Sequence, residues 1–198
     1  MGKRVTLATF AILLAGSLLA GPWGVVRGPG MPDRALDGRD DSGAAVLSDA
    51  DLPAGSTDVV FSNSVSIGGI ALSGRELRFS AAKEGVVLST TCAANAFLLR
   101  DGNWTFDGLE FSGPGVLPEK AHYYGGAIDC CGGALTVTNC SFSRLAARFN
   151  GGAVSARLMT GDVRFSDCAF KGNVCGPKNG TGGAVYVSGV LDGPTATL

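Results

Sequence analysis

The sequence predicts an all-β protein, a right-handed single-stranded parallel β-helix in which successive turns of the chain stack on one another. Three observations predict it: the composition, a ten-residue segment that recurs at solenoid-sized intervals, and a glycine-pair unit that recurs beside it. Glycine supplies 31 of 198 residues while charged residues supply only 17%, which suits short strands and tight turns better than a helical bundle. The formal net charge of −1 leaves no basic stripe for phosphates, so we expect no nucleic-acid partner.

The amino terminus has the order of charges and apolar residues that is typical of an export signal. Lys3 and Arg4 precede an uncharged apolar run over residues 5–19, and the small residue Ala20 follows. This is the arrangement of a secretory signal peptide. We therefore predict that residues 1–21 are a signal peptide and that the protein is secreted or placed at the cell surface or outer membrane.

A membrane anchor is the alternative interpretation of this apolar run. It is disfavoured because the run is shorter than the roughly 20 residues that a spanning helix needs, and because Pro22 would break a continuing helix. Residues 22–56 are rich in Gly, Pro, Asp, Arg and Ser without a sustained period, so we expect a flexible leader there. The β-helix is then predicted over residues 57–198.

Three segments align without gaps, at residues 102–111, 133–142 and 161–170. Their starts are separated by 133−102 = 31 and 161−133 = 28 positions, which is a solenoid-sized period. In each copy the apolar residues alternate and then change phase, as two short strands that meet at a corner require. The predicted inward columns are Trp104/Leu135/Val163, Phe106/Val137/Phe165, Leu109/Cys140/Cys168 and Phe111/Phe142/Phe170.

The residue at each corner is Gly108, Asn139 or Asp167, and all three residue types tolerate left-handed backbone. A further strand opens with a glycine pair followed by alanine and Ile or Val. The three copies of this unit are Gly125-Gly126-Ala127-Ile128, Gly151-Gly152-Ala153-Val154 and Gly182-Gly183-Ala184-Val185. Alternation along these strands places Ile128, Val154 and Val185 inside, and Asp129, Ser155 and Tyr186 outside in water.

Each repeat supplies about three short strands and is too small to bury its own apolar face. Stacking solves this problem, because every strand then pairs in parallel with its equivalent one turn away and like side chains form ladders. An antiparallel β-sandwich is the competing architecture. A sandwich gives no reason for whole columns to recur with the same bend residue, so the repeat favours the β-helix.

The glycine-pair units, together with Phe170-Lys171-Gly172-Asn173, resemble the chlamydial polymorphic membrane protein family, whose passenger domains repeat the motifs GGA[ILV] and FxxN. With an export signal in front, the chain is similar to an autotransporter passenger of the pectin-lyase-like superfamily. The likeness covers about residues 57–198. It implies an adhesin-like or structural module at the cell surface that binds a protein or a glycan, and a β-barrel or further repeats beyond Leu198, where the last turn is expected to be incomplete. A fragment without independent function is the alternative.

Cysteines are the first candidates for chemistry in this sequence. Cys140 and Cys168 share one column on adjacent turns, where a disulfide and two stacked free thiols are both compatible with the strand spacing of about 4.8 Å. The single histidine and the cysteine spacings match no zinc pattern, and we expect neither a metal nor another cofactor.

Enzymes of this fold class would need converging carboxylates on one outward face. The outward or corner aspartates lie in different columns, so we expect no catalytic residues and keep a polysaccharide lyase or hydrolase as the alternative. The remaining candidate is a loop that contains His122, Tyr123 and Tyr124. Exposed aromatic residues on a loop form contact patches for sugars or proteins.

Overall fold

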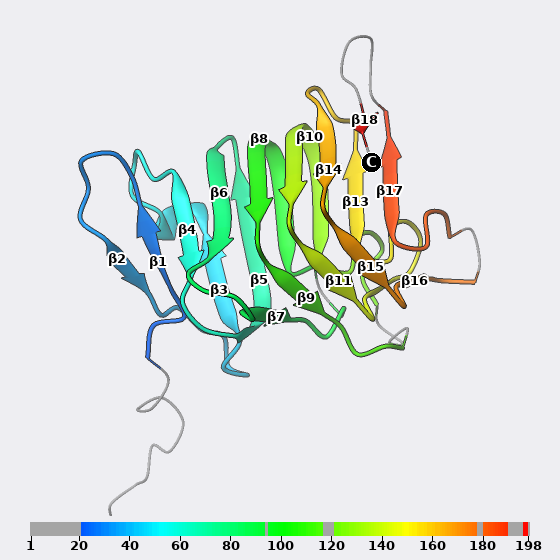
Figure 1. Cartoon of the computed structure of the whole chain (residues 1–198), viewed down its shortest axis with the longest axis horizontal. Helices are drawn as coiled ribbons and strands as arrows, with labels where there is room; N and C mark the ends of the chain where they lie inside the picture. Colours follow the sequence, from blue (N-terminus) through cyan, green and yellow to red (C-terminus); the bar gives the residue numbers. More distant parts are fainter. Residues whose placement is uncertain (1–20, 94, 117–120, 178–179, 190–195, 198) are drawn as a thin grey trace, which may run out of the picture.

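The computed structural model describes residues 21–93, 95–116, 121–177, 180–189 and 196–197. The predicted signal peptide lies outside these residues except for Gly21. The described chain is the predicted parallel β-solenoid, with about four turns (Figure 1). In this part of the chain no helix has the length and apolar character that a membrane crossing requires.

Eighteen strands and one 3-10 turn follow one another along the described chain. They are β1 (Gly24–Arg27), β2 (Arg34–Leu36), β3 (Ala45–Ser48), η1 (Asp49–Asp51), β4 (Asp58–Phe61), β5 (Val65–Ser73), β6 (Glu76–Ala81), β7 (Val87–Ser89), β8 (Phe97–Asp107), β9 (Glu110–Ser112), β10 (Ile128–Thr138), β11 (Ser141–Ser143), β12 (Ala146–Ala147), β13 (Val154–Arg157), β14 (Val163–Ser166), β15 (Ala169–Lys171), β16 (Val174–Cys175), β17 (Val185–Ser188) and β18 (Ala196–Thr197).

Equivalent strands of successive turns pair in parallel and in register, as the repeat predicts. The glycine-pair strands align Ile128, Val154 and Val185, and the ladder continues back through Phe97 to Ile70. The strands of the ten-residue repeat form a second column, and those after the bend a third. Their ladders are Leu77/Trp104/Leu135/Val163, Phe79/Phe106/Val137/Phe165 and Leu88/Phe111/Phe142/Phe170.

The core is a set of like-on-like contacts along the stack. Phe142 lies between Phe111 and Phe170, with ring centroids 4.8 and 4.9 Å away and the ring planes nearly parallel. This is the strand spacing of a parallel sheet, so the backbone ladder itself sets the stacking distance of the rings. Phe170, the last ring of this ladder, and Cys168 are only partly buried against this core.

The three corner residues adopt the left-handed backbone that their residue types tolerate. Gly108, Asn139 and Asp167 have φ angles of +65°, +51° and +54°. Because all three lie at the same position of successive turns, the chain turns the same corner each time. The prediction of a recurring bend residue is therefore confirmed.

The glycine pairs are required by backbone approach between turns. A Cβ on Gly152 would collide with the carbonyl oxygens of Gly183 and Val174 from the next turn, and Gly151 has a φ of +63°. Gly126 is blocked in the same way, by carbonyl oxygens of Gly152 and Ala146. The motif is thus a joint at which consecutive turns pack without side chains.

Residues 22–56 differ from the flexible leader that was expected. β1 pairs antiparallel with both β2 and β4, so this segment closes the first end of the stack. Trp23 is buried and stacks on Phe61 with ring centroids 5.3 Å apart. The prediction failed because the few apolar residues that anchor the segment are scattered among turns; they include Val26, Leu36 and Leu47. The segment works as a cap, which solenoids need over their first apolar face.

The glycine joint gives a test with a matched control. Gly152→Ala should lower the free energy of unfolding by at least about 2 kcal/mol, because two carbonyl groups must move to admit the methyl group. Gly183→Ala, in the same motif one turn later, meets only Asn173 O at 4.0 Å, so its change should stay within about 0.5 kcal/mol. Urea unfolding followed by circular dichroism measures both. Equal losses for the two variants would contradict the assigned joint.

Candidate functional site

The predicted binding loop lies at the corner before the first glycine pair and is held by the stack. Backbone hydrogen bonds join it to both neighbouring turns: His122 N donates to Cys92 O at 2.9 Å, and Phe149 N donates to Tyr123 O at 2.9 Å. The Asn95 side-chain amide, which is buried, donates to Gly125 O at 2.7 Å and also to Tyr124 O. The loop is therefore part of the ladder.

Its aromatic side chains form a cluster on this corner. The Tyr123 ring is stacked on Phe149 of the next turn, with centroids 5.2 Å apart and an angle of 15° between the planes. Tyr123 is still 50% exposed. The guanidinium carbon of Arg148 lies 5.7 Å from the Tyr123 ring centroid. We call the residues His122, Tyr123, Tyr124, Arg148 and Phe149 the aromatic edge.

A buried ion-pair cluster anchors the aromatic edge from the neighbouring sheet. Asp129 accepts hydrogen bonds from Arg157 Nη2, at 2.8 Å to Oδ1 and 3.0 Å to Oδ2, and from Arg100 Nη2 at 3.3 Å. The Arg157 guanidinium also lies over the Tyr124 ring, with its carbon 3.8 Å from the centroid. Arg157 therefore contacts both the buried carboxylate and the loop, and cation–π contact holds Tyr124 in place.

This cluster corrects the prediction that Asp129 and Ser155 face water. Both side chains project from the outer face of the sheet. Even so, Asp129 is only 1% exposed and Ser155 is fully buried. Arg100 and Arg157 come from the strands on either side of β10 and reach over the Asp129 carboxylate. The alternation along a strand predicts correctly which way a side chain points. It does not predict whether side chains from neighbouring turns will cover it.

The FxxN motif joins its own turn to the preceding turn through its asparagine and its phenylalanine. The Asn173 side chain accepts a hydrogen bond from Leu145 N at 2.9 Å and donates one to Phe142 O at 3.0 Å. Asn173 thereby satisfies backbone groups at the corner of the preceding turn, where the ladder is interrupted. Phe170, at the start of the motif, continues the ring ladder of the core.

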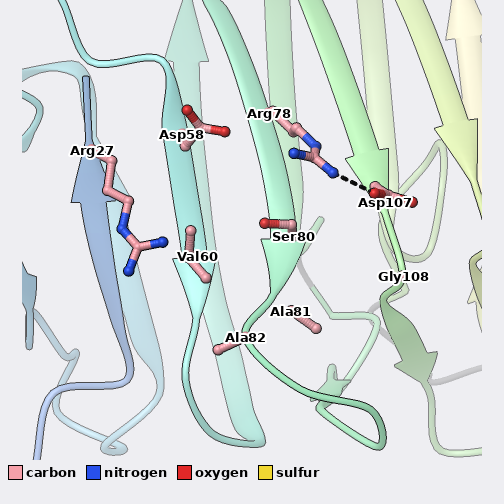
Figure 2. A pocket seen from close by; sticks show the side chains of 9 residues that line it. All are labelled: Arg27, Asp58, Val60, Arg78, Ser80, Ala81, Ala82, Asp107 and Gly108. Carbon is pink, nitrogen blue, oxygen red and sulfur yellow. Dashed lines mark hydrogen bonds and ion pairs between the residues drawn. The ribbon is translucent and has the colours of Figure 1, made fainter. Parts of the chain in front are cut away.

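A groove on the outer face of the early turns was not predicted from the sequence (Figure 2). It has a volume of about 550 Å³ and crosses β1, β4 and β6 to the end of β8. Its charged residues are Arg27, Asp58, Arg78 and Asp107, with Ser80 and Val60 between them. Ladder pairing explains the juxtaposition, because Arg27 aligns with Asp58 and Asp58 with Arg78. Sequence reasoning missed it because the groove combines long polar side chains from several turns, whose reach strand alternation does not encode.

The two carboxylates of the groove differ in their partners. Arg78 Nη2 lies 2.5 Å from Asp107 Oδ2, and Asn139 and Thr138 also donate to Asp107. The hydrogen bond from Arg78, followed by that from Asn139, holds the pKa of Asp107 below its usual value. Asp58 accepts from Thr57 Oγ1 at 2.8 Å, and within the described chain no cation forms an ion pair with it.

All six cysteines are free thiols, so the Cys140 and Cys168 column consists of stacked thiols. Burial raises the pKa of Cys140 and of Cys130 to about 12, which keeps both protonated and unreactive at neutral pH. Cys168 Sγ lies 3.4 Å from Val137 O.

Across the described ranges no group of three or more His, Cys, Asp or Glu side chains is arranged to hold a metal ion.

Comparisons of the chain with protein-family models, with curated proteins and with solved structures give no match. The resemblance to polymorphic membrane proteins accordingly rests on the GGA and FxxN motifs alone. In the structure both motifs have geometric roles at the corners between turns.

The buried anchor makes a testable contribution to stability. Asp129→Asn should lower the free energy of unfolding by about 2–3 kcal/mol, because it leaves two guanidinium groups against a neutral amide in a covered position. Asp33→Asn removes an ion pair whose side chains are about half exposed, so its loss should stay below about 1 kcal/mol. Chemical unfolding at pH 7 compares the two variants. A loss for Asp129→Asn no larger than that for Asp33→Asn would show that the cluster is not an anchor.

Proposed function

We propose that the chain is an exported, adhesin-like binding module without catalysis, which recognises a protein or glycan at a cell surface through the aromatic edge. The observation that carries the proposal is a half-exposed Tyr123 ring stacked on Phe149 and fixed to the solenoid by backbone hydrogen bonds on both sides. Exposed aromatic residues beside arginine are the commonest anchors of recognition surfaces. A surface that is already ordered loses little conformational entropy on binding.

Two further features support export and binding. The amino-terminal order of Lys3, Arg4, an apolar run and Ala20 is that of a secretory signal. The stacked turns also supply a stiff support, since equivalent strands pair in register from turn to turn. Recognition residues on loops that a regular scaffold positions are typical of binding proteins.

The groove residues support binding more than bond cleavage. A glycosidase needs a carboxylic acid whose pKa is raised so that it can donate a proton, whereas the pKa of Asp107 is lowered by donors from Arg78 and Asn139. Asp107 therefore remains a carboxylate over the physiological range. Its oxygens already accept hydrogen bonds from three side chains, which makes it a poor general base.

Adhesion of coated beads tests the leading proposal. Beads that carry the full chain should bind cultured epithelial cells, and Tyr123→Ser should reduce the number of bound beads about tenfold, since removal of a recognition anchor costs more than about 1 kcal/mol. Leu158→Ser is the matched control, because Leu158 is 63% exposed but lies outside the aromatic edge. Equal binding by wild type and Tyr123→Ser, or an equal loss with Leu158→Ser, would overturn the proposal.

A carbohydrate-active enzyme is the second candidate, favoured by one observation. The groove brings two carboxylates and two guanidinium groups together on one outward face, and among the described residues Asp58 has no ion-pair partner there. Under the leading proposal, a panel of neutral and acidic polysaccharides should release no reducing ends and no unsaturated products. Cleavage that is lost in Asp58→Asn but retained in Asp33→Asn would instead establish the enzyme.

A further inference from the structure

The aromatic edge and the surface next to it carry cations that have no ion-pair partner within the described chain. Arg144 and Lys171 lie at one corner, and Arg148 lies at the other end of the short strand β12. All three side chains are exposed. None of them forms an ion pair with another described residue, whereas Arg100 and Arg157 on another face do.

Two of these cations are joined by the ladder, and the third lies further along the same segment, in the aromatic edge. Arg144 N donates to Lys171 O at 2.9 Å, so the two residues are neighbours on successive turns. Arg144 Nη2 donates to Ser112 Oγ at 3.2 Å in the turn before. Arg148 lies against the Tyr123 ring. We call Arg144, Arg148 and Lys171, together with Tyr123, the basic edge.

The chain between these side chains is covered. Ala146 and Ala147 of β12 are fully buried, and Gly176 follows in the next turn. A Cβ on Gly176 would collide with the Arg148 carbonyl oxygen, so the two turns are in close backbone contact here. The groups that this stretch exposes are therefore the three cations, the Tyr123 ring and Val174, which pairs beside Ala146.

The charge of the neighbouring surface restricts where an anion would lie. The other ends of β9, β11 and β15 border a groove of about 490 Å³ whose charged residues are Glu84, Glu110 and Asp167. A polyanion is repelled from that groove and attracted to the basic edge. This separation of charge within a chain of net charge −1 makes the attraction local to one face.

We propose that the basic edge binds an extended anionic polysaccharide, with its sulfate or carboxylate groups on Arg144, Arg148 and Lys171 and one sugar ring on Tyr123. The inference rests on the proposed function, because it names the ligand class of the same edge. A polysaccharide fits better than an acidic protein for two reasons. The exposed large hydrophobic side chains here are Val174 and Tyr123, too few for the contiguous apolar centre that protein interfaces bury, and guanidinium groups bind sulfates and carboxylates in a planar, bidentate manner.

Glycan-coated surfaces provide the test. Heparin supplies sulfates, polygalacturonate supplies carboxylates alone, and dextran is neutral. The full chain should bind heparin or polygalacturonate but not dextran, and raising the salt concentration from about 50 to about 500 mM should weaken binding, because screening acts on exposed charges. The variant with Arg144→Gln, Arg148→Gln and Lys171→Gln should bind at least about tenfold more weakly, since several exposed contacts are lost together.

Lys83→Gln is the control variant, because Lys83 is exposed, unpaired among the described residues and away from the basic edge. It should bind as the wild type does, and circular dichroism should show that all variants are folded. Equal binding to dextran, no binding to either anionic glycan, or an equal loss with Lys83→Gln would overturn the inference.

The failures of the two proposals are distinguishable on cells. If Tyr123→Ser abolishes bead adhesion while the triple glutamine variant adheres normally, the edge binds a partner that is not anionic, and only the inference fails. The inference alone also fails if protease treatment of the cells abolishes adhesion and enzymatic removal of anionic glycans does not. If neither variant changes adhesion, the proposed function fails as well.

Discussion

Parallel pairing of each turn with the next, in register, is the constraint on which the rest of the structure depends. It sets a spacing of about 4.8 Å between equivalent residues, and the core follows from it: the rings of Phe111, Phe142 and Phe170 stack at 4.8 and 4.9 Å because their strands do. The corner residues with positive φ and the glycine joints allow this register to survive each turn of the chain. Asn173 serves the same end by satisfying backbone groups where the ladder is interrupted.

The same register builds the outer surface. Side chains that are about 30 residues apart in the chain become neighbours one strand away, so charge is arranged across turns rather than along them. Asp129 forms ion pairs with Arg100 from the turn before and with Arg157 from the turn after. Arg157 also contacts the Tyr124 ring and so links this cluster to the loop. The aromatic edge and the basic edge are thus extensions of the fold, and their order comes from the stack that also forms the core.

The parts of the fold that can be predicted well from the sequence are those that repeat. The inward columns, the bend residues and the glycine-pair strand are predictable because each occurs in three copies. Aligning the copies shows which positions share a column, as Trp104, Leu135 and Val163 do. The amino-terminal cap is not, because β1 and β2 belong to no repeat and their apolar residues are too few to show a period. The burial of Asp129 and the groove beside Asp58 escape prediction for a related reason. Both depend on long polar side chains from adjacent turns, whose reach alternation does not encode.

The unequal length of the turns has a consequence for how such a surface diverges. Successive residues of the glycine-pair ladder are separated by 97−70 = 27, 128−97 = 31, 154−128 = 26 and 185−154 = 31 positions, yet they remain in register. The difference is absorbed at the corners, where lengthening a loop costs only about 0.6 kcal/mol for each doubling. Insertions and substitutions can therefore accumulate at the edge while the ladders stay unchanged. The fold therefore constrains the residues of the ladders much more strongly than the residues of the corners.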